Sequence, residues 1–220
     1  MDQNHQKVLQ LLLANGAVKE AEFKAMCEDI FNARGFSQHD LDELRASIAK
    51  DIRTFSLDIK QSMFDDGHMY IGIVNTSNDD LTKLSHRFKP WEIILFRKAI
   101  EAIVDNEDGE IDRTELLNLR ENNSVSEVRA LVDRLALEKW LAPSILNDDL
   151  YTLGPRVFLE LGTFIRDLGV LECSICHSDV LQSVRCKTPD CPTRVHESCL
   201  QHNQKSGLSY QCAPCRKPLR

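Results

Sequence analysis

Long hydrophobic runs are missing from this chain of 220 residues. No stretch reaches the roughly eighteen consecutive apolar residues that mark a membrane-spanning helix, so we expect no membrane-spanning segment. The N-terminus also lacks the features of a secretion signal, because a polar start and a short apolar run lead into Asn15-Gly16 instead of a small-residue cleavage site. We therefore expect no secretion and a reducing compartment, the cytosol or the nucleus.

Positive charge is scarce in the first 170 residues. The formal net charge of the whole chain is −7, yet residues 171–220 carry seven Lys/Arg against four Asp/Glu. The C-terminal segment therefore has a charge of +3 and the rest a charge of −10. An acidic surface repels phosphate groups, so we expect no strong autonomous DNA binding by the N-terminal body.

Aromatic side chains are almost absent from residues 171–220, where Tyr210 stands alone. A protein that recognises methylated lysine surrounds the ammonium group with several aromatic rings. One ring cannot form such a cage, so we do not expect this segment to read methyl-lysine by itself.

Cysteine is concentrated in this same segment. Seven of the eight cysteines and one histidine form four consecutive pairs, three with a two-residue gap and one with a slightly wider gap. Zinc binds four nitrogen or sulfur ligands, so eight ligands predict two structural Zn²⁺ ions. The predicted ligands are Cys173, Cys176, Cys186, Cys191, His196, Cys199, Cys212 and Cys215.

A disulfide framework is the alternative to metal binding, but the histidine at ligand spacing and the lack of a secretion signal disfavour it.

The two sites can be filled in adjacent or interleaved order. We favour a cross-brace with Cys173, Cys176, His196 and Cys199 on one ion and Cys186, Cys191, Cys212 and Cys215 on the other. Each ion then ties distant segments together, which suits a module with little core.

The first 84 residues predict three helices followed by a β-hairpin. Apolar residues recur at helical spacing in two segments, and Ser37-x-x-Asp40 resembles a capping box that opens a third helix. Two β-rich runs then flank Asp65-Asp66-Gly67, which is typical of a hairpin turn. Helix, helix, helix, hairpin is the order of a winged-helix domain.

Residues 85–169 repeat this order. A helix opens at Lys89-Pro90, a short helix follows Asp112, and Ser124-x-x-Glu127 caps a third helix. A second hairpin and a final helix between Gly154 and Gly169 complete the unit. We therefore predict an α+β, mainly α protein with two tandem winged-helix domains (1–84 and 85–169) and a C-terminal RING-like finger (170–220) with two zinc ions.

The third helix of each unit argues against groove recognition of DNA. In a DNA-binding winged helix this helix enters the major groove and offers Arg and Lys. Here residues 38–53 and 124–137 mix acidic and basic side chains, and neither helix is basic. We expect both units to contact proteins.

Cross-braced fingers include RING and PHD fingers, and the order of four cysteines, one histidine and three cysteines resembles both. Ile175, between the first two ligands, resembles the apolar residue that RING fingers offer to a ubiquitin-conjugating enzyme. Arg216 resembles the basic residue that some RING fingers lay across ubiquitin, and Pro214 stands one place beyond the usual RING proline. No free thiol remains for a covalent ubiquitin intermediate, since Cys27 looks buried. A ligase of this kind works by positioning a conjugating enzyme that carries ubiquitin as a thioester, with no catalytic side chain of its own.

Four stretches of the sequence are distinctive: residues 173–177 (CSICH), 194–199 (RVHESC), 92–105 (EIILFRKAIEAIVD) and 137–141 (LEKWL). Together with the order of the domains, they closely resemble the non-SMC element one family, the RING-variant subunit of the structural-maintenance-of-chromosomes five/six complex. The resemblance implies a nuclear, chromosome-associated E3 ubiquitin transferase that acts in DNA repair and recombination. It also implies a MAGE-type winged-helix partner that raises a weak ligase activity, and a kleisin-type partner. A non-catalytic architectural subunit with the finger as a docking surface is the alternative, and the missing aromatic residues argue against a third function, a chromatin reader.

Overall fold

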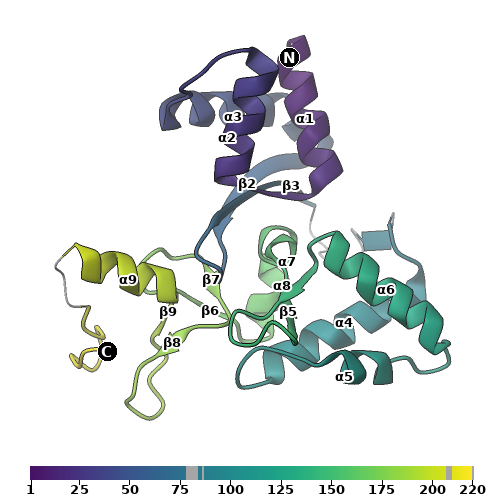
Figure 1. Cartoon of the computed structure of the whole chain (residues 1–220), viewed down its shortest axis with the longest axis vertical. Coiled ribbons are helices and arrows are strands. Elements are labelled where there is room, and N and C mark those ends of the chain that lie inside the picture. The colour runs from purple at the N-terminus through teal and green to yellow at the C-terminus, as the bar shows by residue number, and fades with distance from the viewer. Residues whose placement is uncertain (78–83, 86, 207–209, 220) are drawn as a thin grey trace.

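The computed structural model describes residues 1–77, 84–85, 87–206 and 210–219. Most of the expected junction between the first two units, residues 78–83, lies outside these ranges. Figure 1 shows three parts: helices α1–α3 with a long hairpin, a second helical part, and a C-terminal finger of short strands and one helix. Among the described helices, none combines the length and apolar character that crossing a membrane requires.

The first part has three helices and a three-stranded antiparallel sheet. In the sheet β1 and β2 flank β3, and the hairpin β2–β3 pairs residue by residue from Leu57↔Asn75 to Met63↔Met69. The predicted capping box is present, since Ser37 and Asp40 bond each other's backbone amides at the start of α3. The elements are α1 (Gln3–Asn15), β1 (Ala17–Lys19), α2 (Glu20–Phe31), α3 (Gln38–Ile52), the 3₁₀ turn η1 (Arg53–Phe55), β2 (Leu57–Met63) and β3 (Met69–Asn75).

The predicted turn at 65–67 joins β2 to β3. Gly67 adopts a left-handed backbone, with φ of 80°, that glycine reaches without steric cost. The hairpin extends well beyond the helices, so that its tip lies beside β7 of the finger (Figure 1). The first part thus has its own core under α1–α3 and a second contact surface at the end of its hairpin.

The second part repeats the order of the first. The Ser124/Glu127 capping box opens α6 as predicted. Ile111 forms a bridge to Tyr151, at the place that β1 occupies in the first sheet. The elements are α4 (Pro90–Asp105), α5 (Arg113–Asn118), α6 (Val125–Leu137), β4 (Leu141–Pro143) and β5 (Tyr151–Leu153).

The final helix of the second part is broken, although a single helix was expected. α7 (Pro155–Glu160) and α8 (Gly162–Asp167) are separated by Leu161, whose φ and ψ are −117° and 24°. Gly162 follows the break, and glycine weakens a helix interior. Leu161 itself is fully buried in the hydrophobic core of the second part, so tertiary packing fixes the break.

The finger, from β6 onward, has little regular structure. Its largest element is α9 (Glu197–Lys205), which follows His196 directly. β6 (Leu171–Glu172) pairs with β7 (Asp179–Val180), and β8 (Val184–Arg185) pairs with β9 (Arg194–Val195). A small cluster that includes Val180, Val195 and Leu200 is buried between these pieces. A core of this size needs additional cross-links to be stable.

Candidate metal centre

The structure brings the eight predicted ligands together in two groups of four. In each group the ligand atoms lie within 4.8 Å of one another. The grouping is interleaved, as the cross-brace predicted. All eight cysteines of the chain have free thiols, so no disulfide competes with this arrangement.

The first group contains Cys173, Cys176, His196 and Cys199. Cys173 follows β6, and His196 lies between β9 and the start of α9. The ring nitrogen Nδ1 of His196 faces the sulfurs, at 3.3 Å from Cys176 Sγ and 3.9 Å from Cys199 Sγ. His196 is fully buried.

The second group contains Cys186, Cys191, Cys212 and Cys215. Cys191 Sγ lies 3.5 Å from Cys212 Sγ and also 3.5 Å from Cys215 Sγ. These spacings exceed the length of about 2.05 Å of a disulfide bond. They are close to the separation of about 3.8 Å between two sulfurs that bind one zinc ion at 2.3 Å in a tetrahedron.

The electrostatics of the thiols also fit a cation in the first group. Burial raises the pKa of Cys173, but hydrogen bonds from His196 and from nearby backbone amides outweigh it and lower that pKa to about 6. In the same group, burial and the neighbouring thiolates raise the pKa of Cys199 to about 12. Three thiolates in so small a space repel one another, and a dication relieves that repulsion. The donor sets, three sulfurs with one nitrogen and four sulfurs, fit structural zinc.

One neighbour of the first group was not found by sequence reasoning. Asp65, in the hairpin turn between β2 and β3, places its Oδ1 at 3.6 Å from Nε2 of His196, and both side chains are fully buried. Burial raises the pKa of Asp65 to about 6, while the backbone amide of Gln182 and the His196 ring act in the opposite direction. The sequence marked Asp65 only as a turn residue, and no local pattern links it to a histidine so far along the chain.

The three residues proposed to contact a conjugating enzyme lie at different depths. Ile175 is half-buried and packs against the small core of the finger. Pro214 and Arg216 are exposed, and Arg216 adopts a left-handed backbone with φ of 54°. The exposed pair is therefore available to a partner, and Ile175 offers only part of its surface.

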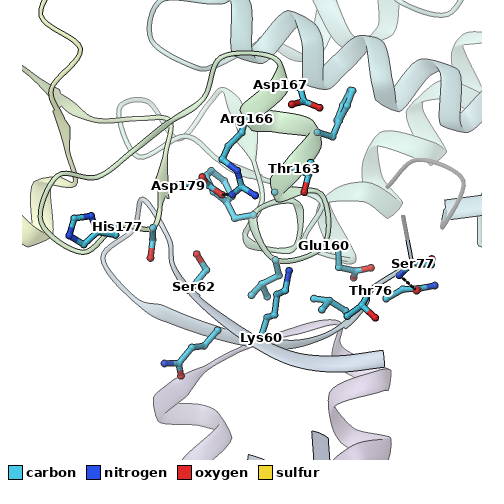
Figure 2. Close-up of a pocket in the computed structure, with 18 residues that line it drawn as sticks. Lys60, Ser62, Thr76, Ser77, Glu160, Thr163, Arg166, Asp167, His177 and Asp179 are labelled. Carbon is cyan, nitrogen blue, oxygen red and sulfur yellow. Dashed lines mark hydrogen bonds and ion pairs between the residues drawn. The ribbon is translucent and has the colours of Figure 1, made fainter. Parts of the chain in front are cut away.

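A polar cleft of about 700 Å³ adjoins the finger and lies between the hairpin β2–β3 and helices α7 and α8 (Figure 2). Across it, Arg166 of α8 donates a 2.7 Å hydrogen bond to Asp179 of β7, which joins the second part to the finger. The described residues that line the cleft include none of the eight predicted ligands.

Comparison with known proteins places this geometry in a family. A family model described as the Nse1 non-SMC component of the SMC5-6 complex matches residues 5–125, more than half of the chain. The chain belongs to the Nse1 family. A second model, described as a RING-like domain, matches residues 173–215, which contain both ligand groups. The resemblance inferred from the sequence is therefore confirmed.

The similarity between this Nse1-family chain and its relatives extends over nearly its whole length. The non-structural maintenance of chromosomes element 1 homolog of Rattus norvegicus is 29% identical over 96% of this chain and 82% of its own length. The human homolog is 28% identical over the same shares, and the Schizosaccharomyces pombe protein is 21% identical over 99% and 92%. A chain from an Nse1-Nse3-Nse4 complex has the same fold, with a TM-score of 0.79, 24% identity, and coverage of 100% of this chain and 97% of that one.

Proposed function

We propose that this chain is the RING-type E3 ubiquitin transferase subunit of an SMC5-6 complex, acting in the nucleus in DNA repair and recombination. The observation that carries the proposal is the pair of complete ligand groups inside the segment that matches a RING-like domain. Each group would hold one structural zinc ion. With all four positions filled by side chains, a bound zinc supplies cross-linking and leaves no position for a reactive water.

The described thiols favour a scaffold mechanism over a covalent one. Seven cysteines lie in the ligand groups. The eighth, Cys27, is fully buried in the core of the first part, and burial raises its pKa to about 11. A protonated, inaccessible thiol cannot accept ubiquitin from a conjugating enzyme. The finger instead acts by docking the ubiquitin-loaded conjugating enzyme and holding its thioester in a reactive pose, which is a proximity effect.

The docking surface that we propose comprises Ile175, Pro214 and Arg216. Pro214 and Arg216 are exposed next to the second ligand group, so cross-linking by zinc would fix their positions. Ile175, between two ligands of the first group, would add a smaller apolar contact. No side chain of this chain would take part in bond making.

We further propose that residues 1–84 and 85–169 form two winged-helix domains that bind protein partners, followed by the finger at 170–220. The shared order of helices and hairpin supports this division. Because the chain of similar fold comes from an Nse1-Nse3-Nse4 complex, the partners that we infer are a MAGE-type winged-helix subunit and a kleisin-type subunit. The acidic charge of the body supports contacts with protein instead of strong autonomous contacts with DNA.

A second candidate is an architectural subunit whose finger is a docking surface without ligase activity. The half-buried position of Ile175 and the polar contacts between finger and body favour it. Ubiquitin chain formation with the MAGE-type partner distinguishes the two candidates. We expect Ile175→Ala and Arg216→Asn to lower it at an unchanged zinc content, since asparagine tolerates the left-handed backbone of position 216. The control is Lys217→Ala, which removes an adjacent exposed charge. Unchanged ubiquitination would favour the architectural role.

A further inference from the structure

The tip of the hairpin β2–β3 encloses one face of the first ligand group. Figure 1 shows the hairpin reaching away from helices α1–α3 to the finger. The backbone amide of Met63 lies 3.3 Å from the hydroxyl of Ser178, two residues after the ligand Cys176. A Cβ atom added to Gly67 would lie 2.7 Å from Cβ of Ser198, which stands between the ligands His196 and Cys199. Residues from the first part therefore contact the finger next to two different ligand segments of this site.

Asp65 lies at the centre of this contact. Its Oδ1 accepts a 3.3 Å hydrogen bond from the amide of Leu181, and its Oδ2 accepts one of 3.1 Å from the amide of Gln182. Its Oδ1 also faces Nε2 of His196 at 3.6 Å. The carboxylate belongs to the first part, yet all of these contacts are with the finger.

The His196 ring has two ends with different surroundings. Nδ1 faces the sulfurs of Cys176 and Cys199. Nε2 is buried and has no hydrogen-bond partner within 3.5 Å among the described residues, and Asp65 is the acceptor that it faces. A neutral imidazole that gives the Nδ1 lone pair to a metal must carry its proton on Nε2. A buried N–H needs an acceptor, and a carboxylate also makes the ligating nitrogen more basic.

We propose that Asp65 is a positioning residue of the first metal site. Its carboxylate accepts a hydrogen bond from the Nε2–H of His196, keeps the tautomer whose Nδ1 is free for the metal, and couples the site to the body of the protein. This inference rests on the zinc binding proposed above. Carboxylates that orient a metal-bound histidine typically contribute about 10- to 100-fold in metal affinity.

The second ligand group provides an internal comparison. Its polar neighbours come from the finger itself, for example Thr193, whose hydroxyl lies 3.4 Å from Cys191 Sγ and 3.1 Å from Cys212 Sγ. Among the described residues, Asp65 makes no hydrogen bond or ion pair with this group. Loss of the Asp65 carboxylate should therefore weaken one of the two zinc ions and leave the other unchanged.

The competing explanation is that Asp65 only fastens the finger to the body through the amides of Leu181 and Gln182. The Gln182 side chain offers a control for such fastening. It accepts a 3.0 Å hydrogen bond from the amide of Ile145 and donates one of 2.7 Å to Ser144, both in the second part. Gln182→Ala therefore loosens the finger without removing a group that faces His196.

The test compares the full-length wild-type chain with Asp65→Asn, Gln182→Ala and Asp66→Asn. Asp66 is a matched control, because it stands next in the same turn and binds Tyr70 and Lys19 of its own part. Zinc is counted first, and its transfer to a metallochromic chelator is then followed. We expect Asp65→Asn to lower the affinity for one of the two zinc ions by about 10- to 100-fold, and the controls to resemble the wild type. Replacement by Co²⁺ identifies the site, since three sulfurs with one nitrogen absorb differently from four sulfurs.

Other outcomes separate this inference from the proposed function. Two tightly held zinc ions in both the wild type and Asp65→Asn would overturn the role of Asp65 and leave zinc binding intact. An equal loss of affinity for both zinc ions, or an equal loss in Gln182→Ala, would show that Asp65 only fastens the finger to the body. A wild-type chain with fewer than two zinc ions would overturn the proposed zinc sites themselves.

A measurement on the unaltered protein covers the case in which Asp65→Asn does not fold. Long-range ¹⁵N–¹H correlation spectra of the ¹¹³Cd-substituted chain report which nitrogen of His196 binds the metal. We expect coupling of ¹¹³Cd to Nδ1, and an Nε2 proton that exchanges slowly with water because Asp65 holds it. Metal bound to Nε2, or an Nε2 proton in fast exchange, would refute the proposal.

Discussion

Phe64 and Phe158 meet edge to face, with ring centroids 5.4 Å apart and an interplanar angle of 73°. Phe64 directly follows β2, the first strand of the hairpin, and Phe158 lies in α7 of the second part. Both are buried in a core that also includes Ala17, Tyr70 and Val74 from the first part. The two parts therefore share a hydrophobic core and should unfold together.

Phe158→Ala should destabilise the whole body. Removing a buried phenylalanine side chain costs about 3–5 kcal/mol of unfolding free energy. Thermal and denaturant unfolding followed by circular dichroism would measure the loss. The control is Phe55→Ala, because Phe55 is 75% exposed and its truncation should change stability by less than about 0.5 kcal/mol. Separate transitions for the two parts, with only one affected, would contradict a shared core.

Removal of metal should expose seven thiols and leave the eighth protected. The finger depends on its two ligand groups, whereas Cys27 is enclosed by the helices of the first part. In the reduced protein, a thiol reagent with a strong chelator should modify seven cysteines, while circular dichroism retains most of the helical signal. Cys27 should react only after a denaturant unfolds the body. Reaction of all eight thiols in one phase, or a count that does not depend on the chelator, would argue against this model.

Local features of the structure could be predicted from the sequence because they depend on near neighbours. Capping boxes at Ser37 and Ser124 need only a hydroxyl and an acid three residues apart. The two ligand groups could be inferred from spacing, because a cross-brace is the arrangement that ties distant segments of a short module together.

Features that depend on docking between segments were not predicted. β1 is three residues long and exists because it pairs with β3. The break between α7 and α8 occurs where Leu161 is buried, which hydrophobic periodicity does not reveal. The contact between Asp65 and His196 depends on how the hairpin packs against the finger, and no sequence pattern around either residue predicts it.

The capping box of α3 should contribute measurably to stability. Ser37 accepts a hydrogen bond from the amide of Asp40, and its loss in Ser37→Ala should cost about 1 kcal/mol. Ser47→Ala is the control, since Ser47 lies exposed within the same helix, where alanine is favourable. Hydrogen bonds from Ser37 lower the pKa of Asp40.

This pKa shift gives the capping box a pH dependence. A lowered folded-state pKa contributes stability that is present above the ordinary pKa of an aspartate and is lost as the pH falls through the lowered value. The difference in unfolding free energy between the wild type and Asp40→Asn should therefore shrink in acid. A difference that stays constant down to pH 2 would show that the ionised carboxylate is not responsible.

Gly67 should be required for contact between the hairpin and the finger. Alanine at this position has two costs, the left-handed backbone at φ of 80° and a Cβ atom 2.7 Å from Cβ of Ser198. Gly35 is a matched control, because it has the same φ of 80° and no atom within 4 Å of the added Cβ. Gly67→Ala should therefore destabilise the protein more than Gly35→Ala, and amide hydrogen exchange should increase around residues 178–182 and 196–199.

The double variant Gly67→Ala/Ser198→Gly separates the contact from the backbone strain. Glycine at position 198 removes the Cβ atom that the new methyl group would meet, although it weakens the first turn of α9 by roughly 0.5 kcal/mol. The double variant should therefore regain slow exchange around Asp65 and its partner amides while keeping the strain that Gly35→Ala also has. If Ser198→Gly restores nothing, the cost at position 67 comes from the backbone alone, and the turn does not need a close fit to α9.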